Sequence, residues 1–172
     1  MSASGLKDNN FKDIGSNGSS KSRSPDDILS DDVLSEKADT FIIAIDGSNA
    51  SGKGTIAKMI SEHYGFDYLD TGLLYRAIAF RVIDKGLDPK SLDDIVYIAQ
   101  KSISPEELEN PRLKSGEIGN IASIIGVHKS LRTILDVYQR DFPRGKKGVV
   151  IDGRDIGTFI FSANIDYRLV FL

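Results

Sequence analysis

Nine consecutive residues combine glycines, a lysine and a hydroxyl group in a pattern that suits phosphate binding. The stretch is Gly47-Ser48-Asn49-Ala50-Ser51-Gly52-Lys53-Gly54-Thr55. Glycines let the backbone wrap a polyphosphate, and successive N–H groups then point inward at the anion. Lys53 supplies a positive charge for the β- and γ-phosphates of a nucleoside triphosphate, and Thr55 a hydroxyl group near Mg²⁺. These residues predict a site for ATP and its magnesium ion.

The segments on either side of this loop support the prediction. The apolar run Phe41–Ile45 predicts a buried strand, and residues 56–60 predict the start of a helix. A strand, a glycine-rich turn and a helix are the context that a P-loop requires, and the helix adds its positive N-terminal end. Gly54 stands where Ser or Thr usually follows the lysine, so the hydroxyl comes one residue later. The alternative is an ordinary glycine-rich turn.

A second cluster is Asp70-Thr71-Gly72 with Tyr75-Arg76. Thr71 is placed to cap the apolar helix that follows, and Arg76 lies about one turn into that helix. Charged side chains rarely enter apolar helices without a partner. Arg76 therefore meets an internal carboxylate or faces an anionic ligand, and the sequence leaves both alternatives open.

A third cluster, which begins with Asp152-Gly153-Arg154-Asp155, follows the apolar run Val149–Ile151. Ligands bind beyond the carboxyl ends of strands in open α/β sheets. Asp152 resembles an acid that orients Mg²⁺ through water. Arg154 would serve a phosphate and Asp155 the hydrogen-bonding edge of a base. The alternative is a turn with a local Arg–Asp pair, which contributes little free energy.

The rest of the chain predicts an α/β fold with a parallel sheet covered on both faces. Residues 1–38 are polar and predict a disordered tail, with one nascent helical turn from Ser24 to Leu34. The other expected strands are 66–69, 148–152 and a buried strand at 167–172. The expected helices are 55–64, 73–85, 91–101, a start at 104–107, 115–125 and 129–142.

Length and composition narrow the class of protein. The 172 residues suit one domain, and the absence of cysteine excludes disulfides and thiolate metal sites. Residues 1–40 carry five basic and eight acidic side chains, which accounts for the whole net charge of −3. A neutral body offers no basic surface for nucleic acid. We expect a cytoplasmic monomer without a membrane segment or a signal peptide.

The three clusters, in this order and spacing, resemble the motifs of bacterial cytidylate kinase, and the resemblance covers residues 41–172. Further likeness lies at Asn120–Ser123, Leu131-Arg132 and Gln139–Phe142. The resemblance implies the three-layer P-loop NTPase fold of nucleoside-monophosphate kinases, with residues 84–128 as a helical insert that binds the monophosphate. It also implies transfer of the γ-phosphate of ATP to CMP or dCMP with Mg²⁺.

The resemblance also implies a role for individual residues. Gly47 to Thr55 would bind the ATP phosphates, and Thr71 would lie beside the nucleotide. The CMP phosphate would be held by Arg76 and Arg154, and cytosine would be recognised by Ser123, Arg132 and Asp155. The implied catalytic residues are Lys53, Arg154 and Asp155, and the implied magnesium ligands are Thr55 and Asp152.

The family pattern continues beyond Leu172 with an arginine-bearing lid, a further strand and a closing helix. We therefore expect the chain as given to lack the lid and the last strand, to be poorly stable and to show little or no kinase turnover. Two other hypotheses stay open. One is a P-loop kinase with another small acceptor, and the other is a nucleotide-binding fragment without catalysis.

Overall fold

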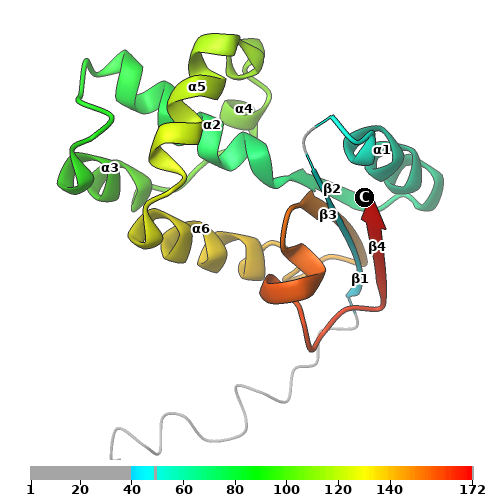
Figure 1. Ribbon diagram of the computed structural model, residues 1–172. Helices are drawn as coiled ribbons and strands as arrows, with labels where there is room; N and C mark the ends of the chain where they lie inside the picture. Colours follow the sequence, from blue (N-terminus) through cyan, green and yellow to red (C-terminus); the bar gives the residue numbers. More distant parts are fainter. Residues whose placement is uncertain (1–39, 49, 172) are drawn as a thin grey trace, which may run out of the picture. The chain divides into compact units, whose positions relative to one another are not determined.

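The computed structural model describes residues 40–48 and 50–171 (Figure 1). The predictions for the tail, including the turn at 24–34, and for Asn49 lie outside the described residues. The described part contains a four-stranded sheet in the order β2-β3-β1-β4, and every neighbouring pair is parallel. The strands are β1 (Phe41–Gly47), β2 (Asp67–Asp70), β3 (Gly148–Gly153) and β4 (Tyr167–Phe171).

Both faces of the sheet are covered, which confirms the three-layer arrangement. Alternate side chains of β1 point to opposite faces, as in any strand. Ile43 and Ile45 pack toward α1 (Lys53–Tyr64), whereas Ile42 and Ala44 join the larger cluster that contains α2 (Thr71–Asp84). Figure 1 shows α1 and α2 on opposite sides of the sheet.

Residues 84–128 are all described and form helices and turns only, as expected. They contain α3 (Leu92–Ala99), α4 (Pro105–Leu108), the 3₁₀ helix η2 (Pro111–Lys114) and α5 (Gly116–Ile125). Helix α6 (Lys129–Asp141) then leads back to β3. Helix α5 packs against α2, and α3 packs against both α2 and α6. Ser104 and Ser115 cap α4 and α5, since their hydroxyl oxygens accept backbone N–H groups, whereas Ser91 precedes α3 without a side-chain cap bond.

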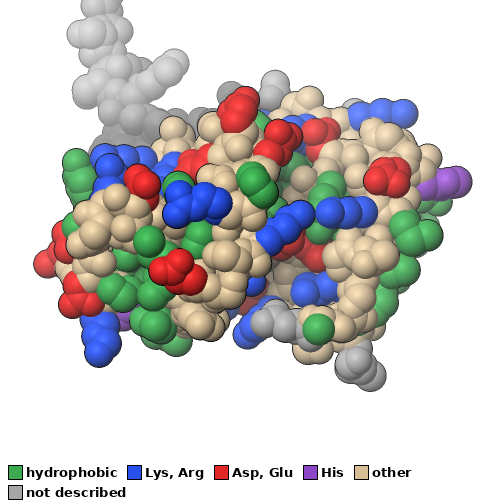
Figure 2. Space-filling view, turned by 90° about the horizontal axis from the view of Figure 1, so that it is seen from above, with side chains coloured by type: hydrophobic (Ala, Val, Ile, Leu, Met, Phe, Trp, Pro, Cys, Tyr) green, Lys and Arg blue, Asp and Glu red, His purple; other side chains and the backbone are tan. Residues whose placement is uncertain are grey.

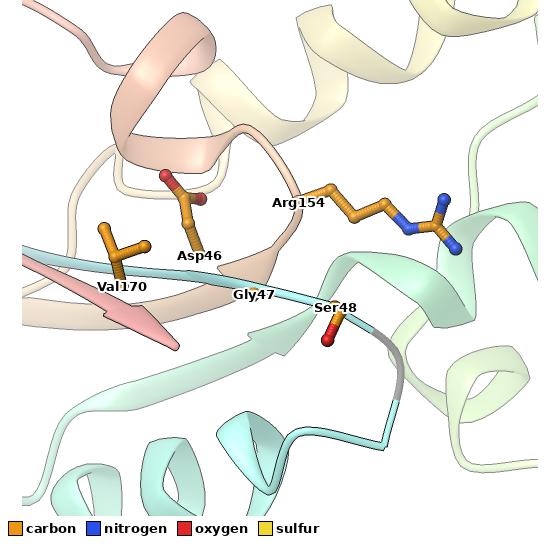
Figure 3. Close-up of a pocket in the computed structure, with 5 residues that line it drawn as sticks. All are labelled: Asp46, Gly47, Ser48, Arg154 and Val170. Atoms are coloured by element: carbon orange, nitrogen blue, oxygen red, sulfur yellow. The ribbon is translucent and has the colours of Figure 1, made fainter. Parts of the chain in front are cut away.

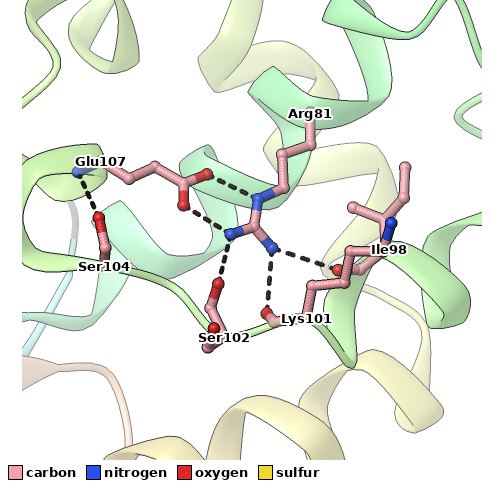
Figure 4. Close-up of polar contacts among 6 residues, drawn as sticks. All are labelled: Arg81, Ile98, Lys101, Ser102, Ser104 and Glu107. Atoms are coloured by element: carbon pink, nitrogen blue, oxygen red, sulfur yellow. Dashed lines mark hydrogen bonds and ion pairs between the residues drawn. The ribbon is translucent and has the colours of Figure 1, made fainter.

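One arginine fastens the first part of this helical region to α2 (Figure 4). The Arg81 guanidinium donates to both carboxylate oxygens of Glu107, at 2.6 and 2.5 Å. It also donates to the main-chain oxygens of Ile98, Lys101 and Ser102. The Arg81 side chain is only 15% exposed. Acceptors on three sides of the guanidinium compensate its buried charge.

Two sequence predictions about these elements are wrong. Helix α2 begins at Thr71, and its cap is Asp70, whose carboxylate accepts the N–H of Gly72 at 2.9 Å. Asp70 is the cap because it directly precedes the first helical residue, where a side chain can accept a backbone N–H group of the first turn. The strand β4, expected to be buried, is an exposed edge, with Tyr167 62% and Val170 52% exposed.

In the described residues, every helix is too short or too polar to cross a membrane.

Candidate functional site

The three clusters found in the sequence meet at one edge of the sheet. They follow β1, β2 and β3, which are neighbours and parallel, so their carboxyl ends lie together. The register places Asp70 opposite Asp152, and Asp46 opposite Gly153. Figure 2 looks down on this edge and shows Lys and Arg side chains around a hollow. The three clusters therefore lie together at the carboxyl ends of neighbouring strands.

The glycine-rich loop has the backbone conformation that an anion-binding turn needs. Ala50 and Gly52 have positive φ angles of 61° and 86°, and Gly52 is the residue that precedes α1. The Nζ of Lys53 lies 3.4 Å from the main-chain oxygen of Ser48, so the ammonium group lies across the loop. Ser51 Oγ is buried and has no hydrogen-bond partner among the described residues.

The loop lines a hollow of about 320 Å³ at the start of α1. The lining residues are Ala50, Ser51, Gly52, Lys53, Gly54, Thr55, Lys58, Tyr68 and Asp70. Two lysines and the N-terminal end of a helix make this hollow positive, whereas Asp70 lies at its border. A polyphosphate would find backbone N–H groups, cations and the Thr55 hydroxyl there.

Asp152 lies at the end of β3 behind the loop and is only 2% exposed. Burial, and next the negative charge of Asp70, raise its pKa to about 6, although Lys53 and Lys58 oppose this. The hydroxyl of Tyr68 donates to Asp152 Oδ1 at 3.4 Å. A cation bound beside the Asp152 carboxylate would offset the cost of this buried negative charge.

Gly54 explains why the loop departs from the usual Lys-Ser or Lys-Thr pair. A Cβ atom at Gly54 would lie 3.3 Å from Asp152 Oδ2 and 3.6 Å from the Tyr68 hydroxyl. Glycine therefore leaves room for the Asp152 carboxylate to lie directly against the loop. The hydroxyl group that the pattern needs is supplied at the next residue by Thr55.

The oxygen donors around the loop suit Mg²⁺. Magnesium prefers oxygen ligands and is usually held by one or two carboxylates together with substrate phosphates and water. Asp152 supplies a buried carboxylate, and Thr55 supplies an exposed hydroxyl. The described residues contain no group of three or more His, Asp or Glu side chains that could hold a metal without a nucleotide. The residues therefore fit a magnesium ion that arrives with its nucleotide.

Two polar residues of this edge were missed in the sequence. Asp46 is 3% exposed, and its carboxylate accepts the N–H groups of Ile156 at 2.6 Å and Gly157 at 3.1 Å. It thereby fixes the loop that carries Arg154. The signal was available, because Asp46 ends an apolar strand as Asp152 does. Tyr68 carried no such signal, because an aromatic residue in a strand is ordinary core material.

Thr71, expected beside the nucleotide, points inward. It is 6% exposed, and its hydroxyl donates to the main-chain oxygen of Asp152 at 2.9 Å. Thr71 thus ties the start of α2 to the end of β3, and a direct contact with a nucleotide stays a prediction.

Arg76, on the first turns of α2, meets main-chain oxygens rather than a carboxylate. Its Nη1 donates to the oxygens of Leu113 at 2.7 Å and Ser115 at 3.1 Å. In the described part of the chain no acidic side chain pairs with Arg76. The internal ion pair that the sequence left open is therefore not found there. Nη2 and Nε have no hydrogen bond in these residues and are left as donors for an anion.

Arg132 and Asp155, predicted to act on the same ligand, lie together. The Nη2 of Arg132 on α6 is 2.7 Å from Asp155 Oδ2, and the side chains are 50% and 35% exposed. Ser123 is exposed, and its hydroxyl donates to the Gly119 main-chain oxygen at 3.0 Å, within its own helix. The structure therefore brings two of these three residues into contact.

Two further groups stand beside this ion pair. Asp136 lies one turn beyond Arg132 on α6, and burial, then the charge of Asp155, raises its pKa. Burial likewise raises the pKa of the Tyr75 hydroxyl, which also feels the charges of Arg132 and Asp136. Nothing in the sequence singles out Asp136, because only the fold brings α6 against the segment that follows β3.

Arg154 extends from that loop across the carboxyl end of β1 (Figure 3). A hollow of about 450 Å³ lies beside it, lined also by Asp46, Gly47, Ser48 and Val170. In Figure 3 the guanidinium points away from Asp46 and toward helix α2. Arg154 thus reaches from the side of the glycine-rich loop toward the helix that carries Arg76.

Comparisons with known proteins agree with this geometry. Residues 43–169 match the family described as cytidylate kinase. The chain is 46% identical over 122 residues to the cytidylate kinase of Rhodopseudomonas palustris (strain ATCC BAA-98 / CGA009), which covers 70% of the chain and 56% of the relative. It is 44% identical over 129 residues to the cytidylate kinase of Nitrobacter winogradskyi (strain Nb-255), or 75% of the chain and 60% of the relative. The chain spans little more than half the length of these relatives.

Proposed function

Since the chain belongs to the cytidylate kinase family, we propose that it transfers the γ-phosphoryl group of ATP to the phosphate of CMP or dCMP. The observation that carries the proposal is that the glycine-rich loop, the loop with Arg154 and helix α2 follow neighbouring parallel strands at one edge of the sheet. The glycine-rich loop with Lys53 follows β1, and Arg76 lies on α2, which follows β2. Among the described residues, Nη2 and Nε of Arg76 have no hydrogen-bond acceptor. Arg154 extends between them.

On the donor side, we assign Gly47 to Thr55 to the ATP phosphates. Main-chain N–H groups of the loop and the start of α1 would hold the β- and γ-phosphates. Lys53 would stabilise the negative charge of the phosphates during the transfer. Thr55 and Asp152 would hold Mg²⁺, with Asp152 acting through water. When bound, magnesium neutralises phosphate charge and aligns the phosphate chain.

On the acceptor side, Arg76 and Arg154 would bind the phosphate of CMP. We assign recognition of the base to Ser123, Arg132 and Asp155. Cytosine presents an amino donor beside a ring nitrogen acceptor, and the Asp155 carboxylate would accept from that amino group. Uracil has a carbonyl oxygen at the same place, so Asp155 would repel it.

The reaction needs alignment more than covalent help. A phosphate oxygen of CMP attacks the γ-phosphorus, a new P–O bond forms, and the bond to the β-phosphate oxygen breaks to release ADP. The attacking oxygen is already anionic, so no proton has to be removed by the protein. The cations Lys53, Arg76 and Arg154 would hold two anions in line despite their repulsion.

The test is an ADP-release assay in which CMP, dCMP, UMP and AMP are offered as acceptors. We expect CMP and dCMP to be phosphorylated much faster than UMP, because a site built to hydrogen-bond one donor pattern discriminates against a base with another. Equal rates for CMP and UMP would refute the assignment of Arg132 and Asp155. Binding of ATP without any turnover would favour a nucleotide-binding protein without catalysis.

A further inference from the structure

Gly119 of helix α5 lies directly against the Arg76 side chain of helix α2. A Cβ atom built at Gly119 would lie 2.9 Å from Nη2 of Arg76, 3.2 Å from Nη1 and 3.3 Å from Cζ. These distances are shorter than ordinary van der Waals contact. The guanidinium therefore occupies the space that a side chain at residue 119 would fill.

The same guanidinium is held at the junction of η2 and α5. Nη1 donates to the main-chain oxygens of Leu113 and Ser115, which precede α5. Ser115 is also the cap of α5, since its hydroxyl accepts the N–H of Ile118. One edge of the guanidinium is thus fixed by carbonyl oxygens, and the group packs against Gly119. Nη2 has no hydrogen-bond acceptor among the described residues.

Glycine in the interior of a helix lowers helix stability relative to alanine. Gly119 lies inside α5, which spans Gly116–Ile125, and it does not have a positive φ angle that would require glycine. Backbone conformation therefore gives no reason for glycine at this residue. The contact with Arg76 gives one.

We propose that Gly119 is a positioning residue for Arg76: its missing side chain forms the seat that holds the guanidinium with Nη2 free to bind the acceptor phosphate. This inference rests on the proposed function, because the acceptor phosphate is the ligand that Arg76 is assigned to bind. Gly119 itself touches no substrate. It acts through the place that it leaves for Arg76.

The variant Gly119→Ala tests the seat. The added methyl group meets the far end of a flexible side chain, so the guanidinium is displaced while the helix is kept. We expect the Kd for CMP to rise about tenfold, which is the loss expected for a hydrogen bond to a charged group. The Kd for MgATP should change less than about twofold, and the melting temperature should not fall, because alanine favours the helix.

Gly116→Ala is the matched control. Gly116 belongs to the same helix, and a Cβ atom there would meet no atom within 4 Å. It should leave the Kd for CMP unchanged. In an Arg76→Lys background, Gly119→Ala should have no further effect on CMP binding, because the guanidinium that the methyl displaces is absent. An unchanged Kd for CMP in Gly119→Ala, or an equal loss in Gly116→Ala, would overturn the proposal.

A second readout separates this inference from the proposed function. If the unaltered protein binds no CMP, the proposed function fails, and the seat is then judged from the NMR signal of the Arg76 Nε–H group. A shift of this signal in Gly119→Ala but not in Gly116→Ala supports the seat. An unchanged signal in Gly119→Ala shows that residue 119 does not position Arg76.

Discussion

Replacing Asp152 by asparagine should stabilise the protein while weakening its binding of MgATP. Burial and the charge of Asp70 raise the pKa of Asp152 from 3.8 to about 6. Each pKa unit corresponds to 1.36 kcal/mol, so the ionised carboxylate lowers the free energy of unfolding by up to about 3 kcal/mol at neutral pH. Asparagine removes the charge and keeps an oxygen that can accept from Tyr68.

The pH dependence follows from the direction of the shift. Between pH 3.8 and 6 the folded protein binds more protons at Asp152 than the unfolded chain does. The free energy of unfolding therefore falls as the pH rises through this range. The advantage of Asp152→Asn should be about 0.5 kcal/mol at pH 4, about 1.6 kcal/mol at pH 5 and about 3 kcal/mol above pH 7.

Urea unfolding of both proteins between pH 4 and 8 measures this difference. Asp67→Asn is the control, because Asp67 is 53% exposed and pairs with Lys146 only at 3.4 Å. Its effect should stay below about 1 kcal/mol at every pH. If Asp152→Asn lowers the free energy of unfolding at pH 7, or changes it equally at every pH, then Asp152 is not a destabilising buried charge.

The same substitution should also change nucleotide binding. Asp152→Asn should weaken binding of MgATP more than binding of ATP without magnesium, because the lost charge is assigned to the metal. Equal effects with and without magnesium would remove Asp152 from the proposed metal site.

Two further predictions concern the framework around the site. Arg81→Ala should lower the free energy of unfolding by about 3 kcal/mol in urea titrations, because Glu107 keeps a largely buried charge without its partner, whereas Arg144→Ala, at an arginine 82% exposed, should change it by less than about 0.5 kcal/mol. Thr71→Val should lower it by about 1–2 kcal/mol through the lost hydrogen bond to the Asp152 main chain, and Thr71→Ser should restore most of this. Similar losses for Arg81→Ala and Arg144→Ala, or for valine and serine at residue 71, would contradict these assignments.

Much of the fold could be predicted because local signals and tertiary structure agree. The apolar runs Phe41–Ile45 and Val149–Ile151 predict the strands that became β1 and β3. Gly65, with a positive φ of 65°, ends α1 as a glycine cap does. The edge strand β4 misled the prediction, because its apolar residues resemble a buried strand. Only the strand order reveals that it has a neighbour on one side in the described residues.

The site was predicted where charged residues interrupt apolar patterns, as at Arg76 and Asp152. It was missed where the decisive fact is an approach between distant segments. Gly54 leaves room for a carboxylate 98 residues away in sequence, and Gly119 leaves room for Arg76. The sequence alone does not reveal which atom of the folded protein will occupy the space beside a glycine.

Simultaneous binding of donor and acceptor is tested most directly by calorimetry with a single molecule that joins adenosine to cytidine through a polyphosphate chain. The glycine-rich loop and the arginines of α2 and the β3 loop are proposed to hold donor and acceptor at the same time. We expect one molecule to bind per chain, at least about 100-fold more tightly than ATP or CMP alone. Binding no tighter than that of ATP alone would contradict a shared site at this edge of the sheet.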